Sequence, residues 1–126
     1  MTVLIDSSAW LEYFLGTTRG ERVRRLVLTK EHLLVSPINI VEVYVKESKE
    51  ENRRVADECR AFMTGRCEVA DVTEKIAFEA AKLGLEKKLG LADALIYATA
   101  SLHGATLLTL DNDFRGLPSA EILEPK

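Results

Sequence analysis

The segment TVLIDSS, residues 2–8, decides the fold of this chain. Its first half is an apolar run without polar alternation, which is typical of a strand buried on both faces in the middle of a parallel sheet. Asp6 follows this run directly. In open α/β sheets, ligands bind in the crevice beyond the carboxyl ends of the strands. The segment therefore predicts an α/β fold with Asp6 at the mouth of that crevice.

Asp6 also has a purely structural explanation. Aspartate and serine are preferred N-cap residues, and a helix pattern follows from about Ser8 to Leu15, with Trp10 and Phe14 on one face. Helix capping alone would account for Asp6. Whether Asp6 is a cap or a site residue therefore depends on the motifs in the remainder of the chain.

The composition fits a single domain over residues 1–126, because 126 residues that are 47% hydrophobic can bury one sizeable core. A net charge of −3 argues against a protein that holds nucleic acid by overall positive potential. Cys59 and Cys67 form neither a CxxC motif nor a Cys/His cluster, so we expect no disulfide framework, no zinc site and a reducing cytoplasm. Neither a signal peptide nor a membrane span is indicated, and we expect a soluble protein.

A second apolar run, Leu33–Ser36, is followed by Pro37, which suits the first position of a helix. The next segment, Ile38–Val45, contains Glu42 as its only side chain that is charged at neutral pH. High β-propensity leaves a strand as an alternative for this segment. A carboxylate in apolar surroundings is costly unless it is paired or bound to a metal, although a glutamate at a helix edge can also reach solvent.

Lys46–Arg54 is almost entirely charged, which indicates an exposed helix end, a loop and a new helix start rather than a site. The helix beyond it is expected to end at Gly65 and to bury four side chains: Val55, Cys59, Phe62 and Met63.

Leu91–Ala100 is apolar on all sides except for Asp93, so it predicts a buried helix with one carboxylate near its start. Asp93 could also serve as an N-cap. The following apolar run, Ala105–Leu110, predicts a strand that leads directly into Asp111 and Asp113.

Four carboxylates are thus expected at one edge of a parallel sheet: Asp6, Glu42, Asp93 and Asp111. Without a nearby lysine or arginine they would repel one another strongly, and a divalent cation would relieve this repulsion. Ligation by oxygen alone favours Mg²⁺ or Mn²⁺ over zinc. A water molecule whose pKa is lowered by the metal can attack a phosphodiester.

These motifs, DSS at residues 6–8, Glu42, LADALIYA at residues 91–98 and TLDNDF at residues 109–114, together resemble the PIN domain family. In size and order the chain resembles the VapC-type toxins of toxin–antitoxin pairs. The resemblance implies an endoribonuclease that depends on Mg²⁺ or Mn²⁺, with a Rossmann-like parallel sheet flanked by helices in three layers, and inhibition by an antitoxin. It also implies a catalytic set, Asp6, Glu42, Asp93 and Asp111, of which Asp6, Asp93 and Asp111 bind metal, and a supporting set, Ser7, Ser8, Thr109 and Asp113. The last acidic position of the family falls on either Asp111 or Asp113, and we favour Asp111 because it directly ends the strand.

Three other functions can be compared with this one. A phosphoaspartyl hydrolase needs a second aspartate two residues after the first, where this chain has Ser8. A nucleotide-binding domain needs GxGxxG or GxxxxGK[ST], and neither motif occurs. A catalytically idle PIN-like module that binds RNA or a protein is the alternative that remains. The intact acidic set argues against it, because a module that only binds does not need four crowded carboxylates.

The first helix carries more large apolar side chains than one core-facing stripe requires, so we expect part of this surface to be exposed and to associate with another chain. A homodimer is expected, with the antitoxin contacting apolar surface beside the acidic pocket and blocking RNA. The alternative is that the helix is simply covered on both sides by its neighbours. The side chains concerned are Trp10, Leu11, Tyr13, Phe14 and Leu15.

Overall fold

A computed structural model of the protein describes residues 1–29 and 31–124. Its strands are β1 (Thr2–Ile5), β2 (His32–Val35), β3 (Glu68–Val69), β4 (Thr106–Thr109) and β5 (Ala120–Ile122). Its helices are α1 (Ser7–Leu15), α2 (Glu21–Leu28), α3 (Pro37–Glu50), α4 (Arg53–Arg66), α5 (Glu74–Lys87), α6 (Leu91–Leu102) and the short 3-10 helix η1 (Asn112–Phe114). Within the described residues, every helix is too short or too polar to cross a membrane.

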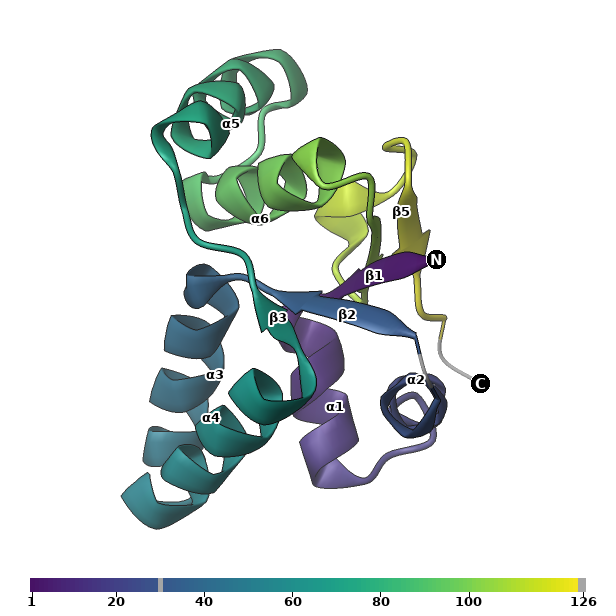
Figure 1. Ribbon diagram of the computed structural model, residues 1–126, viewed down its shortest axis with the longest axis vertical. Coiled ribbons are helices and arrows are strands. Elements are labelled where there is room, and N and C mark those ends of the chain that lie inside the picture. Colours follow the sequence, from purple (N-terminus) through teal and green to yellow (C-terminus); the bar gives the residue numbers. More distant parts are fainter. Residues whose placement is uncertain (30, 125–126) are drawn as a thin grey trace.

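The five strands form one parallel sheet in the order β3-β2-β1-β4-β5, which places β1 at its centre (Figure 1). Leu4 of β1 is in register with Leu34 on one side and Leu107 on the other. All three of these leucines are almost completely buried. The apolar run at the start of the chain is therefore the central strand that its sequence predicts.

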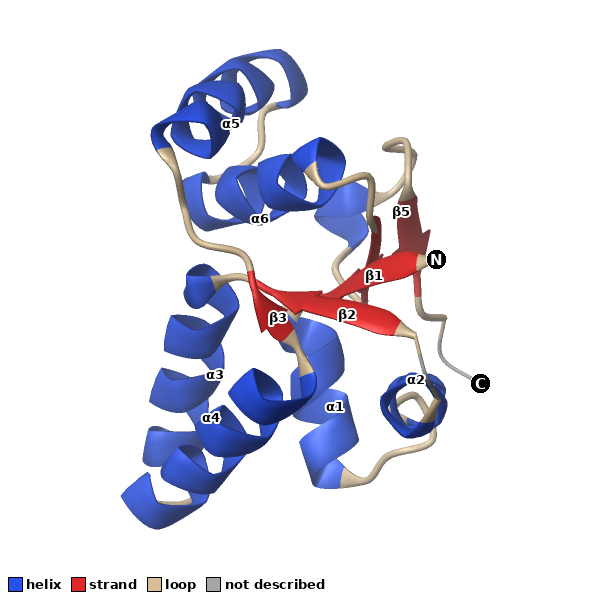
Figure 2. Ribbon diagram, viewed as in Figure 1, coloured by secondary structure: helices blue, strands red, loops and turns tan. Residues whose placement is uncertain are grey.

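Helices cover both faces of the sheet, as the separation of blue and red elements in Figure 2 shows. Val3 and Ile5 pack with helices α1 to α4 on one face, and Leu4 packs with α6 on the other. Helix α5 lies on the outside of α6 through Ile76 and Ala80. The expected three-layer α/β fold with a parallel sheet is confirmed.

Residues 38–45 belong to helix α3 and not to a strand. Local capping explains why this segment is a helix although its β-branched side chains favour a strand. The Ser36 hydroxyl accepts a hydrogen bond from the Ile38 N–H, and the Asn39 side-chain oxygen accepts one from the Ser36 N–H. Pro37 then fixes the first helical residue. These contacts direct the chain into a helix at the carboxyl end of β2.

Two expectations for the α4 region were wrong. Helix α4 does not end at Gly65 but continues to Arg66. Phe62 is not buried: 38% of its surface is exposed, because it packs on the side of Tyr13 rather than beneath the helix. Val55 is only half-buried, whereas Cys59 and Met63 are buried as expected. The outer edge of α4 therefore contributes apolar surface to the exterior.

Candidate active site

Asp6 stands at the carboxyl end of β1, where its backbone is still extended and its N–H bonds to the Leu108 carbonyl at 2.9 Å. Its side chain is buried and makes no capping hydrogen bond to α1, so the capping explanation is wrong for this residue. The carboxylate instead accepts hydrogen bonds from the hydroxyls of Thr109 at 2.6 Å and Ser8 at 3.2 Å. Asp6 is thus oriented by Thr109 at the end of β4 and by Ser8 in the first turn of α1.

Ser8 and Thr109 join the ends of two neighbouring strands around this carboxylate. Their hydroxyl oxygens are 3.3 Å apart. The Ser8 hydroxyl also accepts from the Leu110 N–H, and the Thr109 hydroxyl accepts from the Asp111 N–H, both at 3.0 Å. The two hydroxyls therefore fix the backbone that leads from β4 to Asp111.

Glu42 lies on α3 and points toward the same edge of the sheet. Its Oε1 accepts a hydrogen bond of 2.6 Å from the Ser7 hydroxyl. That hydroxyl in turn accepts one of 3.0 Å from the Asn39 side-chain amide, which also lies 3.5 Å from Asp6 Oδ1. Glu42 is half-buried and held in place, rather than free in solvent at a helix edge.

The sequence reasoning missed Asn39, which is completely buried and connects Ser7, Asp6 and the cap of α3. A signal was present, because Asn39 is the only polar residue besides Glu42 in an apolar segment and lies three residues after Ser36. That spacing is the one at which an N-cap serine and a polar residue form a capping box.

Asp93 is in the first turn of α6, but Gly90 occupies the N-cap position and Asp93 makes no capping hydrogen bond. One carboxylate oxygen each from Asp93, Asp111 and Asp113 lies within 4.8 Å of the others. This group of three, called the acidic triad below, does not include Asp6 or Glu42. Asp111 also caps η1 by accepting a 2.9 Å hydrogen bond from the Asp113 N–H.

Five carboxylates at this edge interact electrostatically, although they are not all in contact: Asp6, Glu42, Asp93, Asp111 and Asp113. Burial raises the pKa of Asp93 to about 6, with further contributions from the charges of Asp111, Asp6, Glu42 and Asp113. Burial likewise raises the pKa of Asp6, and its hydrogen bond from Thr109 lowers it in part. None of the ion pairs among the described residues involves any of these five side chains. The cluster has no internal counter-charge.

Comparison with protein-family models gives one decisive result: residues 3–119 match the PIN domain. This chain belongs to the PIN domain family. A comparison with curated protein sequences gave no match.

Solved structures share the fold of this PIN domain over nearly its whole length. A toxin–antitoxin complex from Klebsiella pneumoniae is similar with a TM-score of 0.81 and 25% identity, covering 97% of this chain and 98% of that one. VapBC2 from Rickettsia felis, bound to a DNA fragment from its promoter, has a TM-score of 0.78 and 20% identity over 98% and 100%. Mycobacterium tuberculosis VapC20, a sarcin–ricin loop cleaving toxin, has a TM-score of 0.75 and 18% identity over 92% and 95%.

The donor set of this PIN domain fits a hard divalent cation. The acidic triad offers carboxylate oxygens only, and Mg²⁺ and Mn²⁺ prefer such ligands. The pKa of Asp93 is raised first by burial and then by the charges of the neighbouring carboxylates, and a bound cation would favour the charged form against both effects. Asp111, Asp113 and Asp93 are thus the residues of this edge that could hold a metal directly, with Asp6 buried behind them.

Proposed function

We propose that this PIN domain is a Mg²⁺- or Mn²⁺-dependent endoribonuclease that serves as the toxin of a VapBC-type toxin–antitoxin pair in the cytoplasm. The observation that carries the proposal is the cluster of five carboxylates without a counter-charge at the carboxyl edge of the sheet. The similarity to VapBC2 supports a toxin–antitoxin pair, and the similarity to a sarcin–ricin loop cleaving toxin supports RNA as the substrate class.

In this proposal Asp93 and Asp111 hold the metal together with Asp113, and Asp6 lies beside it. When bound, the metal lowers the pKa of a water molecule and stabilises the leaving oxygen of the phosphodiester. Glu42 completes the catalytic set. Because its Oε1 is held by Ser7, its Oε2 is left to accept a proton or a hydrogen bond at the cleavage site.

Ser7, Ser8 and Thr109 support the carboxylates without being nucleophiles. The Ser7 hydroxyl donates to Glu42, and those of Ser8 and Thr109 donate to Asp6. A carboxylate that accepts such hydrogen bonds keeps a fixed orientation and more of its negative charge. We therefore assign these three residues to positioning.

The test is cleavage of a fluorescent single-stranded RNA by the purified protein with Mg²⁺ or Mn²⁺ and with a chelator. We expect cleavage that needs the metal and is abolished by Asp93→Asn, which also excludes a contaminating ribonuclease. Asp71→Asn is the matched control, because Asp71 is exposed and outside the cluster. If the wild-type protein binds RNA but does not cut it with either metal, the idle binding module is the better description.

We further propose a homodimer, but on a different surface from the first helix. Trp10 of α1 is completely buried, so it is not available to a second chain. The most exposed large apolar side chains lie on α5 and at the start of α6, where Leu85 is 84% and Leu91 is 80% exposed and Phe78 lies nearby on α5. An exposed apolar patch of this kind usually marks an association surface.

The antitoxin is proposed to bind on the other side of the molecule, where Leu11, Tyr13 and Phe14 are half-buried and Leu15 is exposed. This is the part of the first helix that remains accessible. The Klebsiella pneumoniae structure, a toxin–antitoxin complex, supports a partner of this kind.

A further inference from the structure

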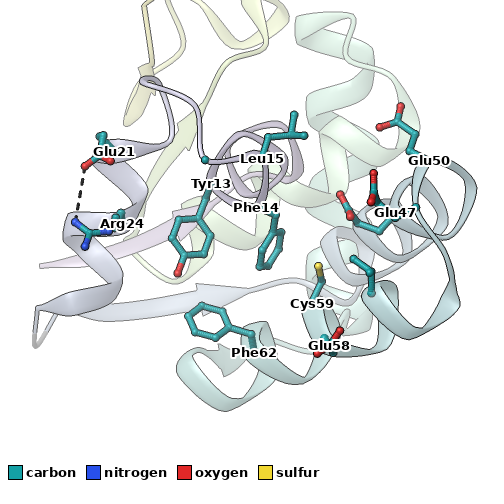
Figure 3. A pocket seen from close by; sticks show the side chains of 13 residues that line it. Tyr13, Phe14, Leu15, Glu21, Arg24, Glu47, Glu50, Glu58, Cys59 and Phe62 are labelled. Atoms are coloured by element: carbon teal, nitrogen blue, oxygen red, sulfur yellow. Dashed lines mark ion pairs between the residues drawn. The ribbon is translucent and has the colours of Figure 1, made fainter.

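A groove of about 760 Å³ lies among α1, α2, α3 and α4, away from the acidic triad (Figure 3). Its apolar part comes mainly from Tyr13, Phe14 and Phe62. The rings of Tyr13 and Phe62 are stacked with centroids 5.7 Å apart, and those of Tyr13 and Phe14 are 5.3 Å apart. This aromatic surface is open enough to receive an apolar side chain from another molecule.

The remainder of the groove is strongly acidic. Five glutamates line it, Glu21, Glu47, Glu50, Glu51 and Glu58, against one arginine, Arg24, which already lies 3.9 Å from Glu21. Such a surface repels the phosphates of RNA and the headgroups of anionic lipids. It attracts a segment of protein that is both basic and apolar.

Glu47 differs from the other glutamates of the groove because only 6% of its surface is exposed. No hydrogen bond or ion pair among the described residues involves its carboxylate, whereas the neighbouring Glu50 pairs with Lys46 at 2.9 Å. Burial, with the charges of Glu51 and Glu50, raises the pKa of Glu47. The carboxylate oxygens themselves are not fully enclosed, because the buried polar atoms without a hydrogen-bond partner among the described residues belong to Trp10 and Ser48. A cation in the groove can therefore reach the Glu47 carboxylate and offset the cost of its partial burial.

We propose that Glu47 determines the specificity of this groove by forming an ion pair with an arginine or lysine of a basic, apolar antitoxin segment whose apolar side chains pack on Tyr13, Phe14 and Phe62. The inference rests on the proposed function, because that function requires a protein partner. Glu47 acts on partner binding and has no part in RNA cleavage.

The experiment begins with a random peptide library displayed on phage and selected against the full-length protein. We expect enriched peptides to carry arginine or lysine within one helical turn of a large apolar residue. One enriched peptide is then synthesised with arginine and with citrulline, its neutral isostere. The arginine peptide should bind at least about tenfold more tightly, because a buried charge pair loses this much or more when one partner is removed.

Glu47→Gln should abolish the difference between the two peptides, and Glu86→Gln should preserve it. Glu86 is the matched control, since it is an exposed glutamate on α5, outside the groove. Backbone amide shifts on peptide addition should change around Tyr13 and Phe62. The inference would be overturned by enrichment of neutral or acidic peptides, or by no enrichment at all. It would also be overturned by amide shifts confined to other surfaces, or by a Glu47→Gln protein that still prefers the arginine peptide.

The result is independent of the nuclease test. If the protein selects basic peptides through Glu47 but does not cut RNA, the inference about the groove stands and the proposed nuclease activity is wrong. If the protein cuts RNA with metal but shows no preference for basic peptides, only the inference about the groove is wrong.

Discussion

The charged form of Asp93 is destabilised in the folded protein in the absence of metal. Burial and four neighbouring carboxylates raise its pKa to about 6 from an ordinary value of 3.8. The folded state therefore binds a proton more readily than the unfolded chain does. Ionisation of Asp93 lowers the free energy of unfolding as the pH rises from about 4 to about 6, and the loss is complete above that range.

Replacing Asp93 by asparagine should therefore stabilise the metal-free protein at pH 7.5. We expect the free energy of unfolding to increase by about 1 kcal/mol. This value is smaller than the pKa shift alone would give, because the side chain is partly exposed and solvent screens its charge. The gain should shrink toward zero near pH 4, where wild-type Asp93 is protonated. Urea unfolding at both pH values measures this, with Asp71→Asn as the control. Equal stability changes at pH 4 and pH 7.5 would contradict the assignment of the strain to the charge of Asp93.

A substitution of Asn39 tests whether the hydrogen bonds that hold Ser7, Glu42 and Asp6 in place matter for metal binding. Asn39→Ala removes the donor to Ser7 and weakens the hold on Glu42 and Asp6, so Mn²⁺ affinity measured by calorimetry should fall about 10- to 100-fold. Asn52→Ala is the matched control, because Asn52 only caps α4. Both variants should lose stability, but Asn52→Ala should bind Mn²⁺ like the wild type. Equal affinities in the two variants would mean that Asn39 serves the fold alone.

At the scale of the element, α3 connects the two surfaces of the molecule that we assign to function. Its first turns carry Asn39 and Glu42 to the acidic site, and its last turns carry Glu47 to the groove. Its start is determined by Ser36 and Pro37 at the end of β2. The position of both surfaces therefore depends on where this one helix begins.

Ser36→Ala should lower the free energy of unfolding by about 1 kcal/mol, because it removes the hydroxyl that accepts from the Ile38 N–H. Ser48→Ala on the same helix is the control. The Ser48 hydroxyl is buried without a hydrogen-bond partner among the described residues, so its removal should be neutral or stabilising. Thermal unfolding of both variants provides the comparison, and a larger loss in Ser48→Ala would contradict this account of the cap.

An element could be predicted from the sequence where its own residues determine its structure. Strands β1 and β4 were predictable with the aspartates that follow them, because each is a short run of β-branched and leucine residues without a charge, as is typical of inner strands. Strand β5 was not, since it has three residues, lies at an edge and includes Glu121, which pairs with Arg22 of α2. Tertiary packing, which the sequence pattern does not contain, also decided that Phe62 is exposed and that Glu47, within a charged run, is buried.

At the scale of the whole molecule, the acidic edge of the sheet, the groove and the apolar surface of α5 and α6 are three separate regions, and α5 lies far from the groove helices in Figure 1. The proposed antitoxin groove and the proposed dimer surface therefore differ from the proposed RNA site at the acidic edge. That distant aspartates gather at one edge was predictable at this scale, because parallel strands end at the same edge of a sheet. That Asp113, rather than Asp6, groups with Asp93 and Asp111 was not predicted. The proposed dimer surface was not predicted either, since it depends on which helix remains uncovered.

The dimer surface can be tested by light scattering. Leu85→Lys should convert the homodimer to a monomer, because it places a charge in the apolar patch on α5. Leu15→Lys, at an exposed position of α1, should leave the dimer intact. A monomeric wild-type protein at micromolar concentration, or a dimer that only Leu15→Lys disrupts, would contradict this assignment.

The central claim is that the carboxylates at the edge of the sheet bind a catalytic metal, and a crystal soaked with Mn²⁺ tests it most directly. Anomalous scattering locates Mn²⁺ independently of any assumption about activity. We predict a peak coordinated by Asp93 and by Asp111, Asp113 or both, with Asp6 beside it, and no such peak in crystals of Asp93→Asn. Mn²⁺ bound elsewhere, or no peak among these carboxylates in the wild-type crystal, would contradict the claim.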